Sequence, residues 1–257
     1  MLDLKKIAEN LIDTFKQAGE ASIKTYDAGL KIEHKEDASP VSNGDLLVNE
    51  ILCKKIKELT PNLEIISEEN YEEGKQYNDK DFWLIDPIDG TKEYIAGKDE
   101  YTLNAALILN KKPALGLVGV PKKNRIFYSY GQGNSYLIDN EKLIKLSNQK
   151  KTPKGAVLAV TSSPNPKGPI LEVLQKHGMT KFQEIRSSYK FCVIATGEFD
   201  IYAARERANE WDYAAGHAIA EHAGVLVTTL DEKKFEYGKT GYKNLSLLVK
   251  RKIDLND

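Results

Sequence analysis

The chain has 257 residues, of which 41% are hydrophobic and 29% are charged, enough to bury the core of one or two globular domains. Its 37 basic and 38 acidic residues leave a formal net charge of −1, which argues against nucleic acid or a membrane surface as a partner recruited by bulk charge. No apolar run approaches the roughly 20 residues that span a bilayer, so stable membrane insertion is not expected.

Two amphipathic helices are predicted at the start of the chain. Apolar residues recur at helical spacing over residues 4–18, and Asp3 precedes them as the candidate N-cap. A second helix is predicted to open at Asp45 and to stop before Pro61, with loop or irregular strand over residues 29–44.

Short strands are predicted next, and the first two lead directly into acidic residues. The run at 63–66 ends in Ser67-Glu68-Glu69, and the run at 82–85 ends in Asp86-Pro-Ile-Asp-Gly-Thr91. Residues 102–138 then alternate between strand-like runs and turn signals, which predicts an antiparallel meander.

The polar stretch 147–155 is the predicted boundary between two lobes. Residues 1–150 would form an N-terminal α+β lobe that carries most of the candidate site residues, and residues 151–252 a smaller C-terminal α/β lobe that completes the site. In the smaller lobe, strands at 157–161, 200–203, 225–228 and 245–249 are predicted to alternate with helices at 167–177, 189–196 and 212–223.

Acidic residues at the ends of these elements are the main functional clue. Asp86 and Asp89 flank a Pro-Ile pair and precede Gly90, and this backbone would let both carboxylates face one point. Glu68 and Asp212 also lie at ends of predicted elements, so the four acids could converge. A hard cation such as Mg²⁺ takes oxygen ligands and leaves positions for water and phosphate.

Each acid also has a purely structural explanation. Asp86 and Asp89 are common turn residues. Adjacent acids after a strand, such as Glu68 and Glu69, often belong to a solvated loop, and at most one of them can face inward. Asp212 makes a good helix N-cap. Only the combination of three such sites favours a metal cluster.

Three motifs together resemble the inositol monophosphatase superfamily of lithium-sensitive, Mg²⁺-dependent phosphatases. They are Ser67-Glu68-Glu69, then Asp86-Pro-Ile-Asp-Gly-Thr91, then Trp211-Asp212-Tyr-Ala-Ala-Gly216, and their order and spacing match over nearly the whole chain. The resemblance implies an α+β fold, the layered αβαβα sandwich of the sugar phosphatases.

Within the superfamily, the chain is most similar to the bacterial 3′(2′),5′-bisphosphate nucleotidases of the CysQ type. The hexapeptide continues as Lys92-Glu93-Tyr94, whereas inositol monophosphatases usually have Asn in place of Glu93, and residues 187–192 resemble the nucleotidase segment Ser-Ser-x-Lys-Phe-Cys. Residues 203–208 depart from the pattern. They read Ala-Ala-Arg-Glu-Arg-Ala where relatives tend to have Pro-Arg-Phe-Gly-Pro-Thr, and the displacement of Arg205 by one position puts a substrate role for it in doubt.

The resemblance assigns a metal and a catalytic role to individual residues. Two or three Mg²⁺ ions would be held by Glu68, Asp86, the Ile88 carbonyl, Asp89 and Asp212. Asp45 and Thr91 would orient and deprotonate the attacking water, with Asp45 accepting a hydrogen bond from the Thr91 hydroxyl. The alternative for Asp45 is a helix N-cap.

The resemblance also implies where the substrate binds. The scissile phosphate would rest against the N–H groups of Gly90 and Thr91 and the start of the helix at Asp212. Lys190, assisted by Ser187 and Ser188, would bind a second phosphate, and the alternative is that Lys190 is a surface lysine. The substrate-contacting set is therefore Glu68, Ile88, Asp89, Gly90, Thr91, Ser187, Ser188, Lys190 and Asp212.

The predicted reaction is removal of the 3′-phosphate of adenosine 3′,5′-bisphosphate, giving AMP and phosphate in the recycling of a sulfur-assimilation by-product. The alternative within this class is an inositol-1-phosphate or fructose-1,6-bisphosphate phosphatase. A silent metal- or nucleotide-binding regulator is the alternative outside it, although Asp89, Thr91 and Asp212 are all present. The partner would be a small nucleotide, not a nucleic acid, and the oligomeric state is left open.

The cysteines and the N-terminus indicate where the protein works. Cys53 and Cys192 lie in apolar segments without metal-ligand spacing, and the first residues lack the apolar stretch of a signal peptide. We therefore expect a cytoplasmic protein with reduced thiols, with peripheral association at the inner face of the membrane as a further option.

Overall fold

Two long amphipathic helices form the outer layer of the computed structural model, which describes residues 2–35, 38–77, 80–148 and 158–252. Helix α1 spans Leu4–Asp27 and α2 spans Asn43–Leu59, and each buries one apolar face. Asp3 accepts a hydrogen bond from the Lys6 N–H at 3.0 Å, which confirms it as the N-cap of α1. The start predicted for α2 is wrong, because Ser42 caps this helix and it begins before Asp45.

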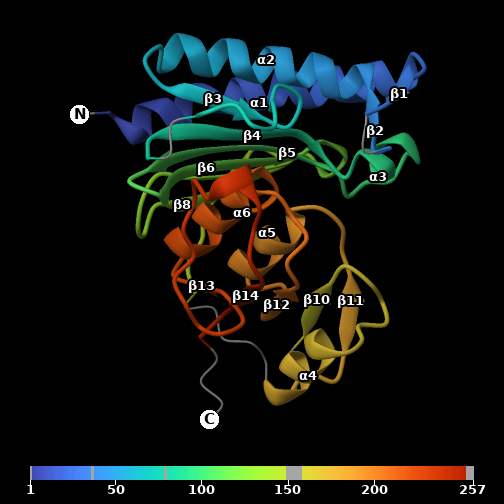
Figure 1. Ribbon diagram of the computed structural model, residues 1–257, viewed down its shortest axis with the longest axis vertical. Coiled ribbons are helices and arrows are strands. Elements are labelled where there is room, and N and C mark those ends of the chain that lie inside the picture. The colour runs from blue at the N-terminus through green and yellow to red at the C-terminus, as the bar shows by residue number, and fades with distance from the viewer. Residues whose placement is uncertain (1, 36–37, 78–79, 149–157, 253–257) are drawn as a thin grey trace.

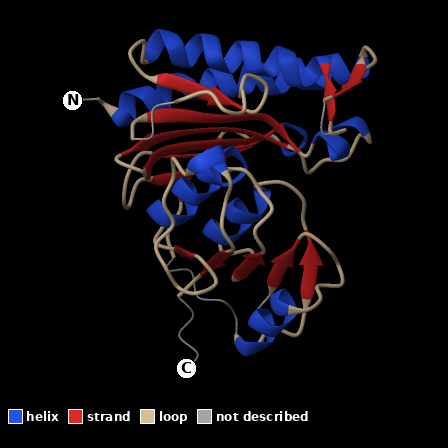
Figure 2. Ribbon diagram, viewed as in Figure 1, coloured by secondary structure: helices blue, strands red, loops and turns tan. Residues whose placement is uncertain are grey.

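A seven-stranded sheet lies beneath these helices, in the order β3-β4-β5-β6-β7-β8-β9 (Figures 1 and 2). Only β3 and β4 are parallel, and the meander predicted from residues 102–138 is confirmed. A two-stranded ribbon, β1 with β2, precedes α2. The bounds are β1 Ile32–His34, β2 Pro40–Ser42, β3 Glu64–Ser67, β4 Phe82–Asp89, β5 Thr102–Leu109, β6 Lys112–Val120, β7 Arg125–Ser129, β8 Ser135–Asp139 and β9 Lys142–Lys145.

The C-terminal part of the chain forms a second sheet of five strands, in the order β11-β10-β12-β14-β13. Its strands are β10 Ala159–Thr161, β11 Phe182–Glu184, β12 Ile201–Ala204, β13 Leu226–Thr228 and β14 Leu247–Lys250. Its helices are α4 Pro169–Lys176, α5 Tyr189–Ala195 and α6 Glu210–His222. The predicted alternation of strands and helices is confirmed, except that the short β11 was not foreseen.

The two sheets sandwich α5 and α6, and α4 packs on the outer side of the smaller sheet (Figure 1). The layers therefore run α, β, α, β, α, as predicted. Helix α6 approaches the larger sheet closely at Gly116, where an added Cβ would lie 2.6 Å from the Ala215 carbonyl oxygen. The predicted boundary at 147–155 falls largely on residues outside the described ranges, so the division into two lobes stays a prediction. None of the described helices is both long and apolar enough to cross a membrane.

Candidate active site

The same local device positions Asp45 and Asp212. Each is the third residue of its helix, and its carboxylate accepts the backbone N–H of the N-cap residue at 2.8 Å, from Ser42 in α2 and from Asn209 in α6. This is a capping box, in which the N-cap and third residues satisfy each other's backbone N–H groups. The prediction that either aspartate is itself an N-cap is therefore wrong, and both carboxylates stand at helix N-termini.

Strand β4 carries both aspartates of the hexapeptide. The prediction that the strand ends before Asp86 is wrong, because pairing with β5 continues to Asp89 across a register shift. Pro87 lies within that irregular stretch, where a missing N–H donor is tolerated. Gly90 follows with a φ of 93°, a left-handed backbone that suits glycine, and the short helix α3, Thr91–Ile95, begins directly after it.

Asp86 and Asp89 are both deeply enclosed. Asp86 is 1% exposed, and its Oδ1 atom has no hydrogen-bond partner among the described residues. Asp89 accepts the Ser188 N–H at 2.5 Å through Oδ2, which ties β4 to the start of α5. A buried carboxylate oxygen without a partner is costly unless something else supplies the missing interaction.

Burial and mutual repulsion make these carboxylates hard to ionise. Burial is the largest cause that raises the pKa of Asp86, and the charges of Glu68, Asp89 and Asp212 raise it further. Burial also raises the pKa of Asp212 and brings that of Asp89 to about 6, although the Lys190 charge and the Ser188 N–H oppose the shift at Asp89. The negative charge of the cluster is therefore only partly balanced by nearby cations.

The residues fit a hard divalent cation by their chemistry. Oxygen ligands, the unpartnered oxygen of Asp86 and the excess of negative charge are what Mg²⁺ would satisfy. In the described ranges, however, no three acidic, histidine or cysteine side chains already lie close enough to hold one ion. Glu68 is one reason, since Lys35 binds it at 3.0 Å and binds Glu69 at 2.9 Å. Metal binding would require these side chains to rearrange.

Of the adjacent acids, Glu68 faces the cluster. Its charge acts on Asp86, Asp89 and Asp212, although the Glu69 side chain is the more buried of the two, at 6% against 27% exposed. The structure thus favours Glu68 over Glu69 as the inward-facing acid, and its role as a ligand stays a prediction.

Asp45 and Thr91 form the hydrogen bond expected of them. The Thr91 hydroxyl lies 3.1 Å from Asp45 Oδ1 and 3.2 Å from the Ile88 carbonyl, and can donate to either. Asp45 is 1% exposed, and burial raises its pKa while its bonds to Ser42 and Thr91 lower it. The second oxygen of Asp45 is held by Ser42, so the carboxylate is fixed in orientation.

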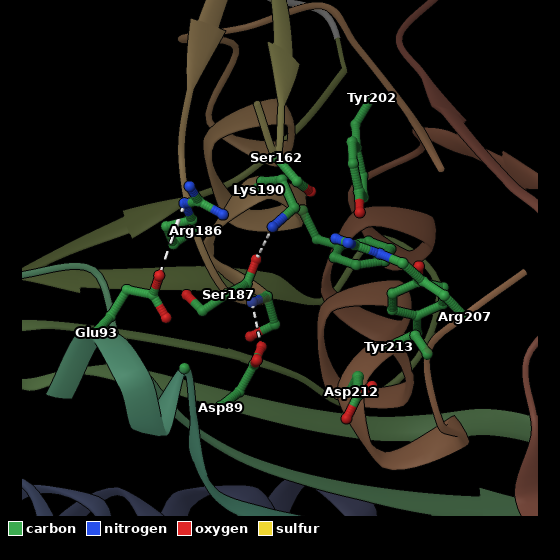
Figure 3. Close-up of a pocket in the computed structure, with 14 residues that line it drawn as sticks. Asp89, Glu93, Ser162, Arg186, Ser187, Lys190, Tyr202, Arg207, Asp212 and Tyr213 are labelled. Atoms are coloured by element: carbon green, nitrogen blue, oxygen red, sulfur yellow. Dashed lines mark hydrogen bonds and ion pairs between the residues drawn. The ribbon is translucent and has the colours of Figure 1, made fainter. Parts of the chain in front are cut away.

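A pocket of about 330 Å³ opens beside Asp89 and Asp212 (Figure 3). Lys190 lines it and is only 6% exposed, so the alternative that it is a surface lysine is wrong. Its ammonium donates to the Ser187 carbonyl at 2.5 Å and lies 5.2 Å from the Tyr202 ring centre. Burial lowers the pKa of Lys190 to about 8 against the opposing charge of Asp89, and the nearby cations Arg207 and Arg186 lower it further.

The serines beside Lys190 are already engaged. The Ser187 hydroxyl donates to the Glu100 carbonyl at 2.5 Å, and the Ser188 hydroxyl bonds to Asn104 at 2.5 Å and to Thr102 at 2.9 Å. Both serines line the pocket, but their hydroxyls would have to turn to meet a ligand. Their assisting role stays a prediction.

Sequence reasoning missed three cations around the site: Lys35, Arg186 and Arg207. Lys35 lies in the stretch interpreted only as loop or irregular strand, and Arg186 directly precedes the recognised serine segment. Arg207 lies in the segment that departs from the family pattern, where only Arg205 was considered. Arg207 could have been considered from the sequence, because it is a second arginine two residues after Arg205 in the same segment.

In metal-free protein, stability should fall as the pH rises from about 4 to about 6. Asp89 ionises near 3.8 in the unfolded chain and near 6 in the fold, so the folded protein holds a proton that the unfolded chain has released. That stability is fully present below 3.8 and is lost as the pH passes 6; Asp86 and Asp212 act in the same direction.

The check is calorimetric melting across this range in EDTA and in Mg²⁺. Mg²⁺ should raise Tm by several degrees at neutral pH, because it binds the folded chain and removes the repulsion. An unchanged Tm would contradict a metal role for these carboxylates.

Comparisons with known proteins agree with this geometry. Residues 3–251 match the profile of the inositol monophosphatase family. The 3′(2′),5′-bisphosphate nucleotidase CysQ of Escherichia coli (strain K12) is 34% identical over 226 residues, covering 86% of this chain and 90% of that protein. The crystal structure of CysQ from Bacteroides thetaiotaomicron superimposes with a TM-score of 0.75 at 26% identity, covering 96% of this chain and 97% of that one.

A third comparison supports the fold alone. An inositol monophosphatase/NADP phosphatase, crystallised with Mg²⁺ and phosphate, has a TM-score of 0.77 at 19% identity. The alignment covers 97% of this chain and 92% of that protein.

Proposed function

This chain belongs to the inositol monophosphatase family, and we propose that it hydrolyses the 3′-phosphate of adenosine 3′,5′-bisphosphate to AMP and phosphate with Mg²⁺ as cofactor. The observation that carries the proposal is a pocket that sets the buried cation Lys190 beside the carboxylates Asp89 and Asp212. In such a pocket, Asp89 and Asp212 would bind the metal that contacts the scissile phosphate, and Lys190 would bind a second anionic group. Likeness to the CysQ nucleotidases supports the choice of substrate.

Glu68, Asp86, Asp89, Asp212 and the Ile88 carbonyl would hold the Mg²⁺ ions, two or three in number. When bound, the ions would neutralise charge on the phosphoryl group and favour ionisation of the attacking water. The chain's own contribution is to fix the carboxylates: Asp212 by the Asn209 N–H and Asp89 by the Ser188 N–H.

Asp45 and Thr91 would handle the proton of the attacking water. With its hydrogen donated to Asp45, the Thr91 oxygen can accept a hydrogen bond from water and orient it toward phosphorus. Asp45 is anchored by Ser42 and its pKa is raised, so it can take the Thr91 hydroxyl proton while Thr91 takes one from the attacking water. The ribose oxygen that leaves phosphorus would take its proton from solvent water. The N–H groups of Gly90 and Thr91 and the first turn of α6 would receive the phosphate oxygens.

The protein would work in the cytoplasm on a small nucleotide, a by-product of sulfur assimilation. The described cysteines, Cys53 and Cys192, are both free, in keeping with a reducing compartment. No feature of the described residues supports the membrane-peripheral option. A silent regulator is not supported, since the bond between Thr91 and Asp45 is intact.

Phosphate release from three substrates tests the proposal. With Mg²⁺, adenosine 3′,5′-bisphosphate should have a far higher kcat/KM than inositol-1-phosphate or fructose-1,6-bisphosphate. A preference for either sugar phosphate would replace the proposed substrate with the alternative from the same family. No release from any of the three would contradict the phosphatase itself.

Replacing Lys190 by alanine should raise KM for the bisphosphate about ten- to a hundredfold and leave kcat nearly unchanged. A charge-assisted hydrogen bond contributes roughly 1.5–3 kcal/mol, and this contact would be the same in ground and transition states. Lys190→Met keeps most of the buried aliphatic stem and should behave alike, whereas the exposed helical control Lys176→Ala should not change KM. If KM for substrates with a single phosphate rises as much as KM for the bisphosphate, Lys190 has a structural role and does not bind the second phosphate.

A further inference from the structure

Two arginines on the loop between β12 and α6 take different directions. Arg207 lines the pocket, and Figure 3 shows its side chain reaching toward Lys190 between Tyr202 and Tyr213. Arg205 lies instead against the start of α4, where a Cβ added at Gly168 would meet its guanidinium at 2.7 Å. Both residues are exposed, so neither is required by the core.

The three cations of the pocket differ in how far they are already neutralised. Arg186 forms ion pairs with Glu93, at 3.7 Å, and with Glu184. The Lys190 ammonium donates to a carbonyl and has the charge of Asp89 nearby. For Arg207, no hydrogen bond or ion pair is formed with any residue in the described ranges. Its charge nevertheless acts on Lys190, so the two cations are close.

Metal binding changes the charge balance of this pocket. Asp89 and Asp212 would turn to the metal, and Glu93 is engaged by Arg186. The charges left facing the pocket are then those of Lys190 and Arg207. A phosphate monoester carries about −1.5 to −2 at neutral pH, which matches these two cations. A guanidinium also offers a planar fork that binds two phosphate oxygens at once.

We propose that Arg207 is a specificity-determining residue that binds the second phosphate of the substrate, the one not hydrolysed, and completes an anion site with Lys190. This rests on the proposed function for the identity of the substrate. Lys190 borders Asp89, and Arg207 lies beyond Lys190 in the same pocket (Figure 3), so one part of the pocket would receive the phosphate that leaves and the other the phosphate that stays. The segment 203–208 departs from the family pattern, and Arg207 is the cation that this segment places in the pocket.

The test compares Arg207→Ala with the matched control Arg205→Ala, because the two are exposed arginines on one loop. Arg207→Ala should raise KM for adenosine 3′,5′-bisphosphate about ten- to a hundredfold at nearly unchanged kcat. With adenosine 3′-phosphate, which lacks the second phosphate, it should behave as wild type. Arg207→Lys should recover part of the affinity, since it restores the charge without the fork. Arg205→Ala should match wild type with both substrates.

A binding measurement keeps the inference testable apart from turnover. In Mg²⁺, calorimetry should show that the wild type binds AMP more tightly than adenosine, and Arg207→Ala should lose most of this preference while Arg205→Ala keeps it. Equal effects of the two variants, or no preference in the wild type, would overturn the role of Arg207. If the preference depends on Arg207 but the bisphosphate is not hydrolysed, the anion site stands and the proposed reaction fails.

Discussion

Replacing Asp89 by asparagine is expected to lower kcat for the bisphosphate by on the order of a thousandfold or more. The change removes one negative charge from a buried cluster whose proposed task is to hold Mg²⁺ against the phosphoryl group, a transition-state contact worth several kcal/mol. The amide keeps the shape of the carboxylate and can still accept the Ser188 N–H, which is bonded at 2.5 Å. The fold should therefore survive.

Two measurements separate lost catalysis from lost folding in this variant. Without metal, Asp89→Asn should melt no lower than wild type, because it removes a charge whose burial is the main cost and relieves repulsion with Glu68, which together offset the lost attraction to Lys190. Asp13→Asn, whose side chain is 81% exposed on α1, is the control and should keep wild-type kcat. An Asp89→Asn enzyme within tenfold of the wild-type rate would contradict the metal assignment.

Replacing Asp45 by asparagine is expected to lower kcat by about a hundred- to ten-thousandfold, the range for loss of a general base. An amide cannot take the proton that the carboxylate would receive through Thr91. Its oxygen can still cap α2 by accepting the Ser42 N–H, so the helix start should persist. Rates at saturating bisphosphate and Mg²⁺ measure the effect.

The partner residue supplies the control for this second prediction. Thr91→Val removes the hydroxyl that bonds to Asp45 at 3.1 Å and should also be slow. If the two residues act as one unit, the double variant should be little slower than the worse single variant, since effects within a unit are not additive. The proposed proton path would be contradicted if the rate loss of the double variant equalled the product of the two single losses, or if Asp45→Asn kept a rate near that of wild type.

The sequence predicted those helices and strands that are determined by local signals, such as apolar spacing, helix caps and turn residues. Helix α1 follows its apolar spacing and its cap, Asp3, and the strands from β5 to β8 follow strand-like runs separated by turn residues. Strand β9, Lys142–Lys145, lies beyond the predicted meander. The three-residue strand β11 was missed because its segment is short and exists only through pairing with β10. β4 extends beyond its prediction because pairing with β5 outweighs Pro87.

The sequence indicated many of the residues of the candidate site, but not the burial or direction of their side chains. Ser42 stands three residues before Asp45, and Asn209 three before Asp212, so the capping-box spacing was visible in the sequence. The burial of Lys190 could not be inferred, because it depends on how the short helix α5 packs between the two sheets, which the local sequence does not determine. The direction of Arg207 depends on how its loop turns over the pocket, which is a tertiary property.

The identity of the nucleotide product is the most direct test of the account. The protein is incubated with adenosine 3′,5′-bisphosphate and Mg²⁺, and nucleotides are separated chromatographically while phosphate is counted. We expect AMP and phosphate in equal amounts, because the 3′-phosphate would meet the carboxylates and the 5′-phosphate would be held by Lys190 and Arg207. Accumulation of adenosine 3′-phosphate, or an intact bisphosphate while inositol-1-phosphate is cleaved, would contradict it.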